Sequence, residues 1–266
     1  MGSHPICRRA TLATVPLFVK RMAILRPATG WPQGYAFALP AVREFGERDL
    51  TAPVTVFVGE NGSGKSTLLE ALAVALGLNP EGGSRSLRFT TRATHSALHD
   101  VLRITRAAQR PRDAYFLRAE SFYNVATAID ELDEHPDNAE ASEPPIRTAY
   151  GDASLHAHSH GEAFFALFCE RLRGPGIYLL DEPEAALSPQ RQLALLARLH
   201  ELVRGGSQFV MATHAPILMA YPGAAVWHFG ADGIREVAAT QTDHWRILRG
   251  FFGDPDGVLR ELLNDD

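Results

Sequence analysis

The stretch Val54-Thr-Val-Phe-Val-Gly-Glu-Asn-Gly-Ser-Gly-Lys-Ser66 contains a complete G-x-x-x-x-G-K-[ST] phosphate loop, which begins at Gly59. A β-branched run leads into the loop, and apolar residues recur at helical spacing after it, so we predict a strand over 54–58 and a helix over 66–76. A strand, a glycine-rich loop and a helix in this order aim backbone N–H groups and the positive end of the helix at phosphates. The sequence therefore predicts a binding site for a nucleoside triphosphate.

Lys65 is one of two lysines in a chain that carries 24 arginines. A compact ammonium can touch two phosphates at once, and the planar guanidinium of Arg does not replace it. We therefore expect Lys65 to bind the β- and γ-phosphates and to serve catalysis, and we expect the Ser66 hydroxyl to bind Mg²⁺. The other nucleotide-binding residues of the loop are expected to be Gly59, Glu60, Asn61, Gly62, Ser63, Gly64 and Thr67.

A second motif, Ile177-Tyr-Leu-Leu-Asp181-Glu182-Pro183, is an apolar strand that ends in two acids. In a phosphate-loop enzyme the first such acid holds Mg²⁺, and the second can polarise the water that attacks the γ-phosphate. We assign Asp181 to the metal and Glu182 to the role of general base. Two acids after a strand also fit a solvated loop, but the phosphate loop elsewhere in the chain favours the functional interpretation.

The composition is that of an ordinary globular protein, with 266 residues, 45% of them apolar and 21% charged. The formal net charge of −5 argues against a surface built throughout to hold nucleic acid and leaves room for a local basic patch. Cys7 and Cys169 form no metal or disulfide pattern, so we expect a reducing, cytoplasmic environment. No stretch approaches the roughly 18–20 apolar residues of a membrane-spanning helix.

These motifs resemble those of the ABC-type ATPases. Ser159-His-Gly161-Glu162 is similar to the family signature that faces the γ-phosphate held by a partner subunit, which implies that Ser159 and Gly161 bind nucleotide across a dimer. From the residues alone, Ser159 and Glu162 form a capping box that opens a helix at Ala163. A capped helix start with a glycine is itself an anion site, so the two interpretations agree.

Three further positions take their roles from this resemblance. The stretch 185–189 lies where the family has its D-loop, with Ser188 where transporters tend to carry Asp. His214 follows an apolar strand over 209–212 and resembles the switch histidine that contacts the γ-phosphate, which makes it a catalytic candidate. Glu120 lies where most members carry a Gln that contacts Mg²⁺ and water, so it is a candidate metal residue that adds a negative charge.

Two weaker patterns in the sequence each leave two interpretations open. Tyr35 and Phe37 precede the phosphate loop at a distance suited to an adenine-stacking aromatic, and each also fits a half-buried strand residue. His156, His158 and His160 alternate, so they fit one side of an extended segment and a metal site, but no nearby Cys or fourth ligand supports that hypothesis.

The spacing of the motifs resembles a small, stand-alone member of the family. Its phosphate loop is closer to the RecF/SMC-like side than to transporter subunits, and the stretches 116–122, 159–162 and 181–192 resemble those of small bacterial predicted ATPases. Fewer than a hundred residues lie between Lys65 and Ser159, without sustained heptads, so we expect no long coiled-coil arm. The resemblance covers nearly the whole chain.

We therefore expect an α/β fold: a phosphate-loop NTPase core of ABC-ATPase type with an inserted, mainly helical subdomain. Residues 1–83 and 162–266 would form the nucleotide-binding core, and 84–161 would form the insertion, with the signature motif at its end. A helix is predicted over 190–204, ended by two glycines.

Charge is divided within this insertion. Residues 84–118 hold eight arginines and two acids, whereas 120–143 hold eight acids and neither Lys nor Arg. A solvated helical subdomain with an acidic loop explains the pattern. The alternative is that the arginines of residues 84–118 bind nucleic acid or an acidic partner.

The resemblance implies a protein that binds and hydrolyses ATP with Mg²⁺ as a head-to-tail homodimer. Our first hypothesis for its role is a cytoplasmic switch or motor on DNA or on a protein effector, in repair or defence. The alternative is the ATP-binding subunit of a membrane transporter, and a third hypothesis is an interaction module that uses ATP only to dimerise. The motifs do not reveal the client, because fold and chemistry do not specify it.

Overall fold

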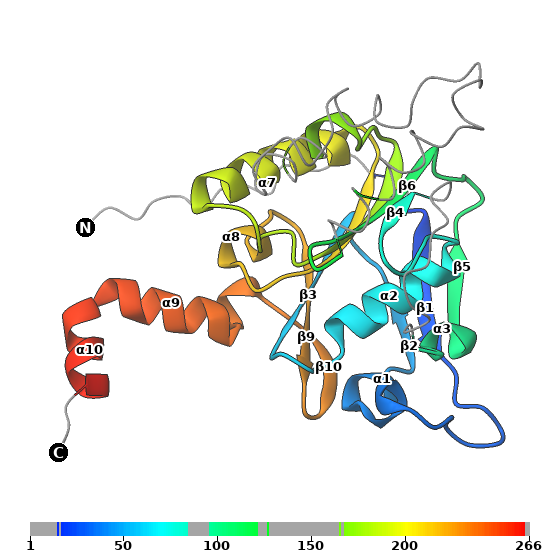
Figure 1. Ribbon diagram of the computed structural model, residues 1–266, viewed down its shortest axis with the longest axis horizontal. Helices are drawn as coiled ribbons and strands as arrows, with labels where there is room; N and C mark the ends of the chain where they lie inside the picture. Colours follow the sequence, from blue (N-terminus) through cyan, green and yellow to red (C-terminus); the bar gives the residue numbers. More distant parts are fainter. Residues whose placement is uncertain are drawn as a thin grey trace.

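A seven-stranded sheet forms the centre of the computed structural model, which describes residues 15, 17–84, 96–121, 127, 165 and 168–263. Its strands are β3 (Val54–Gly59), β4 (Gly83–Ser84), β6 (Asp113–Arg118), β7 (Gly176–Asp181), β8 (Gln208–Ala212), β9 (Ala225–Gly230) and β10 (Gly233–Val237). They lie in the order β10-β9-β3-β8-β7-β6-β4 (Figure 1). The strands from β9 to β6 are parallel, and β10 and β4 pair antiparallel at the two edges. The carboxyl ends of β3, β7 and β8 therefore meet at one edge of the sheet.

Helices cover both faces of this sheet. One face carries α2 (Lys65–Ala75), and the other carries α7 (Pro189–Arg204) and α8 (Pro216–Met219). Successive strand residues point to opposite faces. In β7, Tyr178 packs in the core on the α7 side and Leu179 in the core on the α2 side. Strands buried on both faces read as continuous apolar runs, which is why β3, β7 and β8 are visible in the sequence.

The predicted helices and strands around the phosphate loop are confirmed to within about two residues. The helix predicted over 66–76 is α2, and the helix predicted over 190–204 is α7. Ser188 caps α7 by accepting a hydrogen bond from the backbone of Arg191 at 3.4 Å, Pro189 takes the first helical position, and Gly205 ends the helix.

A second, antiparallel sheet lies beside α2. It contains β1 (Val19–Ile24), β2 (Glu47–Asp49) and β5 (Leu102–Arg106), in the order β2-β1-β5. Gln208 of β8 joins the two sheets, because its side chain accepts from Val19 N at 2.9 Å and donates to Val19 O at 2.8 Å. This small sheet covers the end of the core opposite to the C-terminal helices (Figure 1).

The expected helical insertion over 84–161 needs correction where the chain is described. Residues 102–106 and 113–118 form β5 and β6, which belong to the two sheets and not to a helical subdomain. The physical reason is tertiary: Ala114, Tyr115, Phe116 and Leu117 are all buried because β6 pairs with β7 along its whole length. Residues 85–95, 122–126 and 128–164 lie outside the described part, so the helical character of that stretch stays a prediction.

Short helices complete the described part of the chain. They are η1 (Tyr35–Ala38), α1 (Pro40–Arg43), α3 (Leu98–Val101) and η4 (Ala239–Gln241).

The last helices, α9 (Asp243–Gly253) and α10 (Pro255–Leu263), reach away from the sheets (Figure 1), and Ile247 and Phe252 of α9 are 68% and 71% exposed. Among the described helices, none combines the length and the apolar character that a membrane crossing needs.

Candidate functional site

The phosphate loop joins β3 to α2 at the carboxyl edge of the central sheet. Gly59 has a φ of 146°, and a Cβ there would lie 2.4 Å from the carbonyl oxygen of Phe229 in the neighbouring β9, so only glycine fits. Gly64, with a φ of 102°, precedes the first turn of α2. The tip formed by Glu60, Asn61 and Gly62 is exposed. The loop is therefore open to a ligand on the side where the backbone N–H groups of α2 begin.

Lys65 folds back over this loop. Its Nζ donates hydrogen bonds to the carbonyl oxygens of Gly59 at 2.8 Å and Glu60 at 2.9 Å, and the residue is only 4% exposed. Burial lowers the pKa of Lys65, and the charges of Glu182 and Asp181 oppose that shift. The ammonium thus lies between the loop backbone and a set of carboxylates, in the position expected for a contact with phosphate oxygens.

Ser66 and Asp181 form the second part of the site. The Ser66 hydroxyl donates a hydrogen bond to Oδ1 of Asp181 at 2.9 Å, which joins the first turn of α2 to the end of β7. Burial raises the pKa of Asp181 to about 6, and the Ser66 hydrogen bond and the Arg118 charge partly offset this shift. A hydroxyl and a buried carboxylate together supply the oxygen ligands that Mg²⁺ prefers.

Arg118, at the end of β6, links three acids. Its guanidinium lies 2.9 Å from Glu70 of α2, 3.3 Å from Glu120 and 3.6 Å from Asp181. The Glu120 side chain is 83% exposed and pairs with Arg118, whereas no contact with Ser66 or Asp181 is found in the described part of the chain. The role of Glu120 as a metal residue therefore stays a prediction.

Glu182 follows β7 in a left-handed backbone conformation, with a φ of 51°. A non-glycine residue rarely takes this conformation, and where it occurs the surrounding structure must hold it. Its backbone N–H donates to the carbonyl oxygen of Ala212 at 2.9 Å, which ties the end of β7 to β8. Its carboxylate is half exposed, and Oε1 lies 3.8 Å from Nε2 of His214. The structure therefore brings the predicted base and the predicted switch histidine together.

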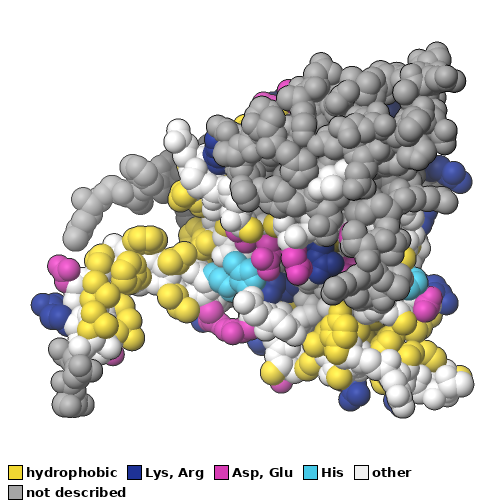
Figure 2. Space-filling model, viewed as in Figure 1, with side chains coloured by type: hydrophobic (Ala, Val, Ile, Leu, Met, Phe, Trp, Pro, Cys, Tyr) yellow, Lys and Arg dark blue, Asp and Glu magenta, His cyan; other side chains and the backbone are white. Residues whose placement is uncertain are grey.

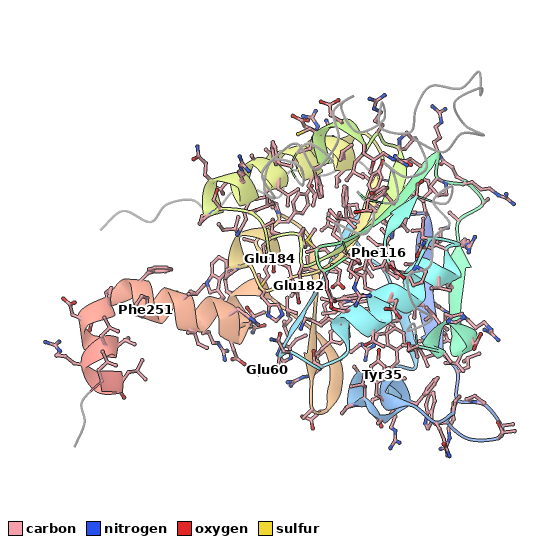
Figure 3. The ribbon with its side chains drawn as sticks, viewed as in Figure 1. Tyr35, Glu60, Phe116, Glu182, Glu184 and Phe251 are labelled. Atoms are coloured by element: carbon pink, nitrogen blue, oxygen red, sulfur yellow. The ribbon has the colours of Figure 1, made fainter. Side chains whose placement is uncertain are left out.

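His214 is held by two residues. Its backbone N–H donates to Oε1 of Glu184 at 2.5 Å, and its Nδ1 lies 2.8 Å from Nε2 of His244 in the first turn of α9. Burial lowers the pKa of both histidines, and burial raises the pKa of Glu184. Figure 3 labels Glu182 and Glu184 close to each other, with Glu60 of the phosphate loop below them.

The charged groups of the site are visible from outside. Figure 2 shows histidine, acidic and basic side chains next to one another near the middle of the face in view, to the right of the C-terminal helices. An apolar groove of about 940 Å³ adjoins them, between α7, α8 and α9, and Glu184 and His214 line one end of it.

The sequence did not reveal four residues of this site. Glu184 lies two residues after Glu182 and is part of the same acidic stretch, whereas Glu70, Arg118 and His244 reach the site from α2, β6 and α9 through the fold. Only the first of them had a local signal in the sequence. The others depend on tertiary contacts.

Ser159 and Gly161 of the predicted signature lie outside the described residues, as do His156, His158 and His160. Their assignments stay predictions. Among the described residues, no group of three or more His, Cys, Asp or Glu side chains is arranged to hold a metal ion. A magnesium site made of Ser66, Asp181 and the phosphates of a substrate does not need such a group, because Mg²⁺ often binds through one or two carboxylates and phosphate oxygens.

The two candidate adenine-stacking aromatics lie on η1 and not on a strand, so the alternative of a half-buried strand residue is wrong for both. Phe37 is buried and stacks on Trp31 at 6.2 Å between ring centroids, whereas Tyr35 is 62% exposed. Leu39, which follows η1, lies against the phosphate loop, since a Cβ on Gly64 would be 3.0 Å from Leu39 Cδ1. Of the two, only Tyr35 is exposed.

Two protein-family models match parts of this chain. Residues 43–135, which include the phosphate loop, match the family model "AAA domain", and residues 163–220, which include the acid pair and His214, match "AAA domain, putative AbiEii toxin, Type IV TA system". The matched regions together contain every described catalytic candidate.

Curated relatives carry the names of ABC transporter components. "Putative ABC transporter ATP-binding protein SCO5958" of Streptomyces coelicolor is 31% identical over 177 residues, which are 59% of this chain and 57% of that protein. "Hemin import ATP-binding protein HmuV" of Rhodopseudomonas palustris is 28% identical over 199 residues, 67% of this chain and 70% of that protein. The chain thus spans less than two thirds of the first of these relatives.

One solved structure shares the fold. An ATP-binding cassette of an ABC transporter, MJ1267, aligns with a TM-score of 0.51 and 15% identity over 91% of this chain and 97% of that one. The SMC head domain from Thermotoga maritima aligns with a TM-score of 0.41 and 16% identity over 84% of this chain and 99% of that one. The first likeness confirms the predicted phosphate-loop NTPase fold of ABC-ATPase type.

Proposed function

We propose that this chain, a relative of the ABC-type ATPases with AAA-type domain matches, binds ATP with Mg²⁺ and hydrolyses it to ADP and phosphate. The observation that carries the proposal is the meeting of Lys65, Ser66 and Asp181 at one point, where a phosphate-binding ammonium adjoins a pair of oxygen ligands for a cation. A phosphate loop without the acid would bind an anion, and the acid without the loop would bind a cation. Together they suit a metal–nucleotide complex.

The residues present fit both groups. Ser63 Oγ is buried without a hydrogen-bond partner among the described residues, and it lies in the loop that would receive phosphate oxygens. The Asp181 carboxylate is buried, and its raised pKa indicates that Ser66 and Arg118 do not fully compensate its charge. Bound Mg²⁺ would neutralise charge on the phosphates and on Asp181.

The side chains then have separate tasks in hydrolysis. Two of the three ammonium N–H donors of Lys65 bind the carbonyl oxygens of Gly59 and Glu60, and the third is available for phosphate oxygens. Glu182 accepts a proton from the attacking water, for which its half-exposed carboxylate is well placed. His214 donates a hydrogen bond toward the γ-phosphate from the nitrogen that faces Glu182. Each task uses a group positioned by a different strand end, so the sheet edge assembles the site.

We further propose that two copies meet head to tail, each supplying Ser159 and Gly161 to the nucleotide of the other. The resemblance of these residues to the family signature supports this, and a helix start is suited to a phosphate. The cytoplasm as the compartment and a DNA or protein effector as the client are proposals of the same kind. The description of the second family model names a toxin of a type IV TA system, which supports an effector.

The activity is tested by phosphate release from ATP with the wild-type protein, Lys65→Ala and Glu182→Gln. Lys65→Ala should weaken nucleotide binding itself, since it removes the ammonium from the phosphate site. Glu182→Gln should bind ATP as the wild type does, lose turnover by about 100-fold or more, and accumulate a dimer in Mg-ATP that is visible by light scattering. Normal turnover by Glu182→Gln would show that Glu182 is not the base.

The client is tested with the same Glu182→Gln protein and fluorescent double-stranded DNA, with and without Mg-ATP, over a salt series. Arg110 and Arg112 lie exposed on the segment between β5 and β6, so the double change to Gln should weaken DNA binding and reduce its salt dependence. Arg204, exposed at the end of α7, provides the control substitution. If an ATP-bound dimer forms without binding DNA at low salt, a protein partner or the membrane partner of a transporter subunit becomes the client to test.

A further inference from the structure

The imidazole rings of His214 and His244, from separate parts of the chain, contact each other near Glu182. Nδ1 of His214, after β8, lies 2.8 Å from Nε2 of His244, and the ring centroids are 4.9 Å apart at an angle of 58°. The other nitrogen of His214, Nε2, is buried, has no hydrogen-bond partner among the described residues and lies 3.8 Å from Glu182. His214 therefore presents one nitrogen to the catalytic carboxylate and the other to His244.

A neutral imidazole carries one N–H and one lone pair, so the contact between two neutral rings allows two arrangements. If His214 donates from Nδ1, its Nε2 is a bare acceptor and repels phosphate oxygens, which also only accept. If His244 donates from Nε2, the proton of His214 must lie on Nε2, and that nitrogen can donate into the site. Only the second arrangement gives the γ-phosphate a hydrogen bond without protonating the ring.

We propose that His244 is a positioning residue: it donates its Nε2–H to Nδ1 of His214 and so holds His214 in the Nε2–H tautomer that the γ-phosphate requires. This inference rests on the ATPase activity proposed above and names a residue that acts through His214. The group that selects the tautomer belongs to the C-terminal helix α9, which follows the last strand of the sheet.

The surroundings of His244 fit this role. Thr242, which is only 1% exposed, caps α9 by accepting from the backbone of Trp245 at 3.3 Å, and its hydroxyl donates to Ala239 of η4 at 2.7 Å. The first turn of α9 is thereby fixed to η4. Burial lowers the pKa of both histidines, which favours the neutral rings, and in a neutral ring only one of the two nitrogens carries a proton.

Glu184 holds the other side of His214. Its carboxylate accepts the backbone N–H of His214 at 2.5 Å, so the main chain of His214 does not depend on His244. Loss of the His244 ring should therefore free the tautomer of His214 while leaving its backbone in place. This separation allows a positioning role to be distinguished from simple packing.

The test compares His244→Phe, which keeps a ring and removes the donor, with His244→Gln, whose amide can still donate. The matched control is His200→Phe, because the ring of His200 on α7 also has a polar partner, with its Nδ1 3.0 Å from the Tyr221 hydroxyl. Long-range ¹H–¹⁵N spectra of histidine-labelled protein report the protonated nitrogen of each ring, and His214→Ala assigns the His214 signals. Steady-state ATP hydrolysis gives kcat and KM for each variant.

We expect His214 to be protonated at Nε2 in the wild type and to lose that preference in His244→Phe. The kcat of His244→Phe should fall about 10-fold with little change in KM, since partners that orient a ligating or donating histidine are worth about 10–100-fold. His244→Gln should return kcat to within about 3-fold of the wild type, because its amide supplies the donor. The control should resemble the wild type in both measurements.

Two results would overturn the proposal: an Nδ1–H tautomer of His214 in the wild type, or an unchanged tautomer in His244→Phe, whether or not kcat falls. If His244→Phe does not fold, the tautomer of His214 in the wild-type spectrum and the kcat of His244→Gln still test the proposal. A wild-type protein that hydrolyses no ATP would refute the proposed function alone, because the spectra need no turnover.

Discussion

The Ser66 hydroxyl donates a 2.9 Å hydrogen bond to Oδ1 of Asp181, across a separation of 115 residues. This bond fixes the distance between the phosphate loop and the end of β7 before any nucleotide is present. Both oxygens would have to turn toward one cation for the site to bind Mg-ATP. The contact therefore shows that the two proposed metal ligands are already close together before nucleotide binds.

Ser66→Ala should separate metal binding from phosphate binding. The substitution removes one oxygen ligand and leaves Lys65 and the loop backbone intact, so we expect affinity for Mg-ATP to fall about 10-fold. Affinity for ATP in EDTA should hardly change. Ser66→Thr keeps the hydroxyl and should retain the Mg²⁺ effect. Titration of a fluorescent ATP analogue with both variants checks this, and an equal loss with and without Mg²⁺ would refute the assignment of Ser66.

Asp181→Asn should stabilise the protein in the absence of nucleotide, and more so at pH 7.5 than at pH 4.5. The folded pKa of about 6 exceeds the ordinary value, so the unfolded chain releases this proton first as the pH rises. The wild type therefore loses stability between about pH 4 and pH 6, and a shift of this size corresponds to about 3 kcal/mol. The uncharged amide introduced by Asp181→Asn avoids the cost of burying a charge.

Thermal unfolding at both pH values measures this difference. Asp232→Asn, which removes an exposed carboxylate between β9 and β10, is the control and should change little. The same Asp181→Asn protein should lose its Mg²⁺-dependent nucleotide affinity, because Mg²⁺ binding requires the negative charge of Asp181. Burial of that charge lowers the stability of the folded protein. A destabilised variant at pH 7.5 would mean that the hydrogen bond from Ser66 and the nearby charge of Arg118 outweigh the cost of burial.

The sequence predicted the parts of this site whose signals are local. The phosphate loop, the acid pair and His214 each follow an apolar run, and in a parallel sheet such runs end at one edge, so the three meet as expected. The strand β6 was missed because the arginines around it dominated the interpretation of that stretch. Its apolar residues Ala114 to Leu117 are the signal that identifies a buried strand.

His244 and Arg118 could not be found from the sequence, for a different reason. A lone histidine at a helix start and one arginine among many have no pattern of their own. Their roles come from the pairing of β6 with β7 and from the path of the chain after β10, which return them to the phosphate loop. Such contacts depend on the whole fold and not on any window of sequence.

Tyr35→Ala should weaken ATP binding through the base and not through the phosphates. Tyr35 is exposed on η1, and the segment that follows η1 packs against the phosphate loop through Leu39. Stacking on a base is worth about 1–3 kcal/mol, so affinity for ATP should fall at least about 5-fold, while affinity for inorganic triphosphate stays the same. Tyr35→Trp keeps a ring and should bind ATP normally. Equal affinity of Tyr35→Ala and the wild type for ATP would exclude this ring from the adenine site.

Glu184→Gln and Glu184→Ala should differ in both stability and turnover. Oε1 of Glu184 accepts the backbone N–H of His214, and Ala leaves that buried donor unpaired, which costs about 1–3 kcal/mol. Gln keeps an oxygen in the same place and removes a carboxyl group whose pKa burial already raises, so it should fold at least as well as the wild type. The Glu184→Ala protein should also hydrolyse ATP more slowly, because His214 loses its support.

Thermal unfolding and steady-state kinetics of the two variants test this prediction together. Glu201→Ala, an exposed acid of α7 that pairs only with Arg198 among the described residues, controls for the loss of a negative charge. If Glu184→Gln were as slow as Glu184→Ala, the carboxylate charge and not the hydrogen bond to His214 would be the required feature. Glu184 would then join Asp181 and Glu182 as a third acid that acts on the reaction directly.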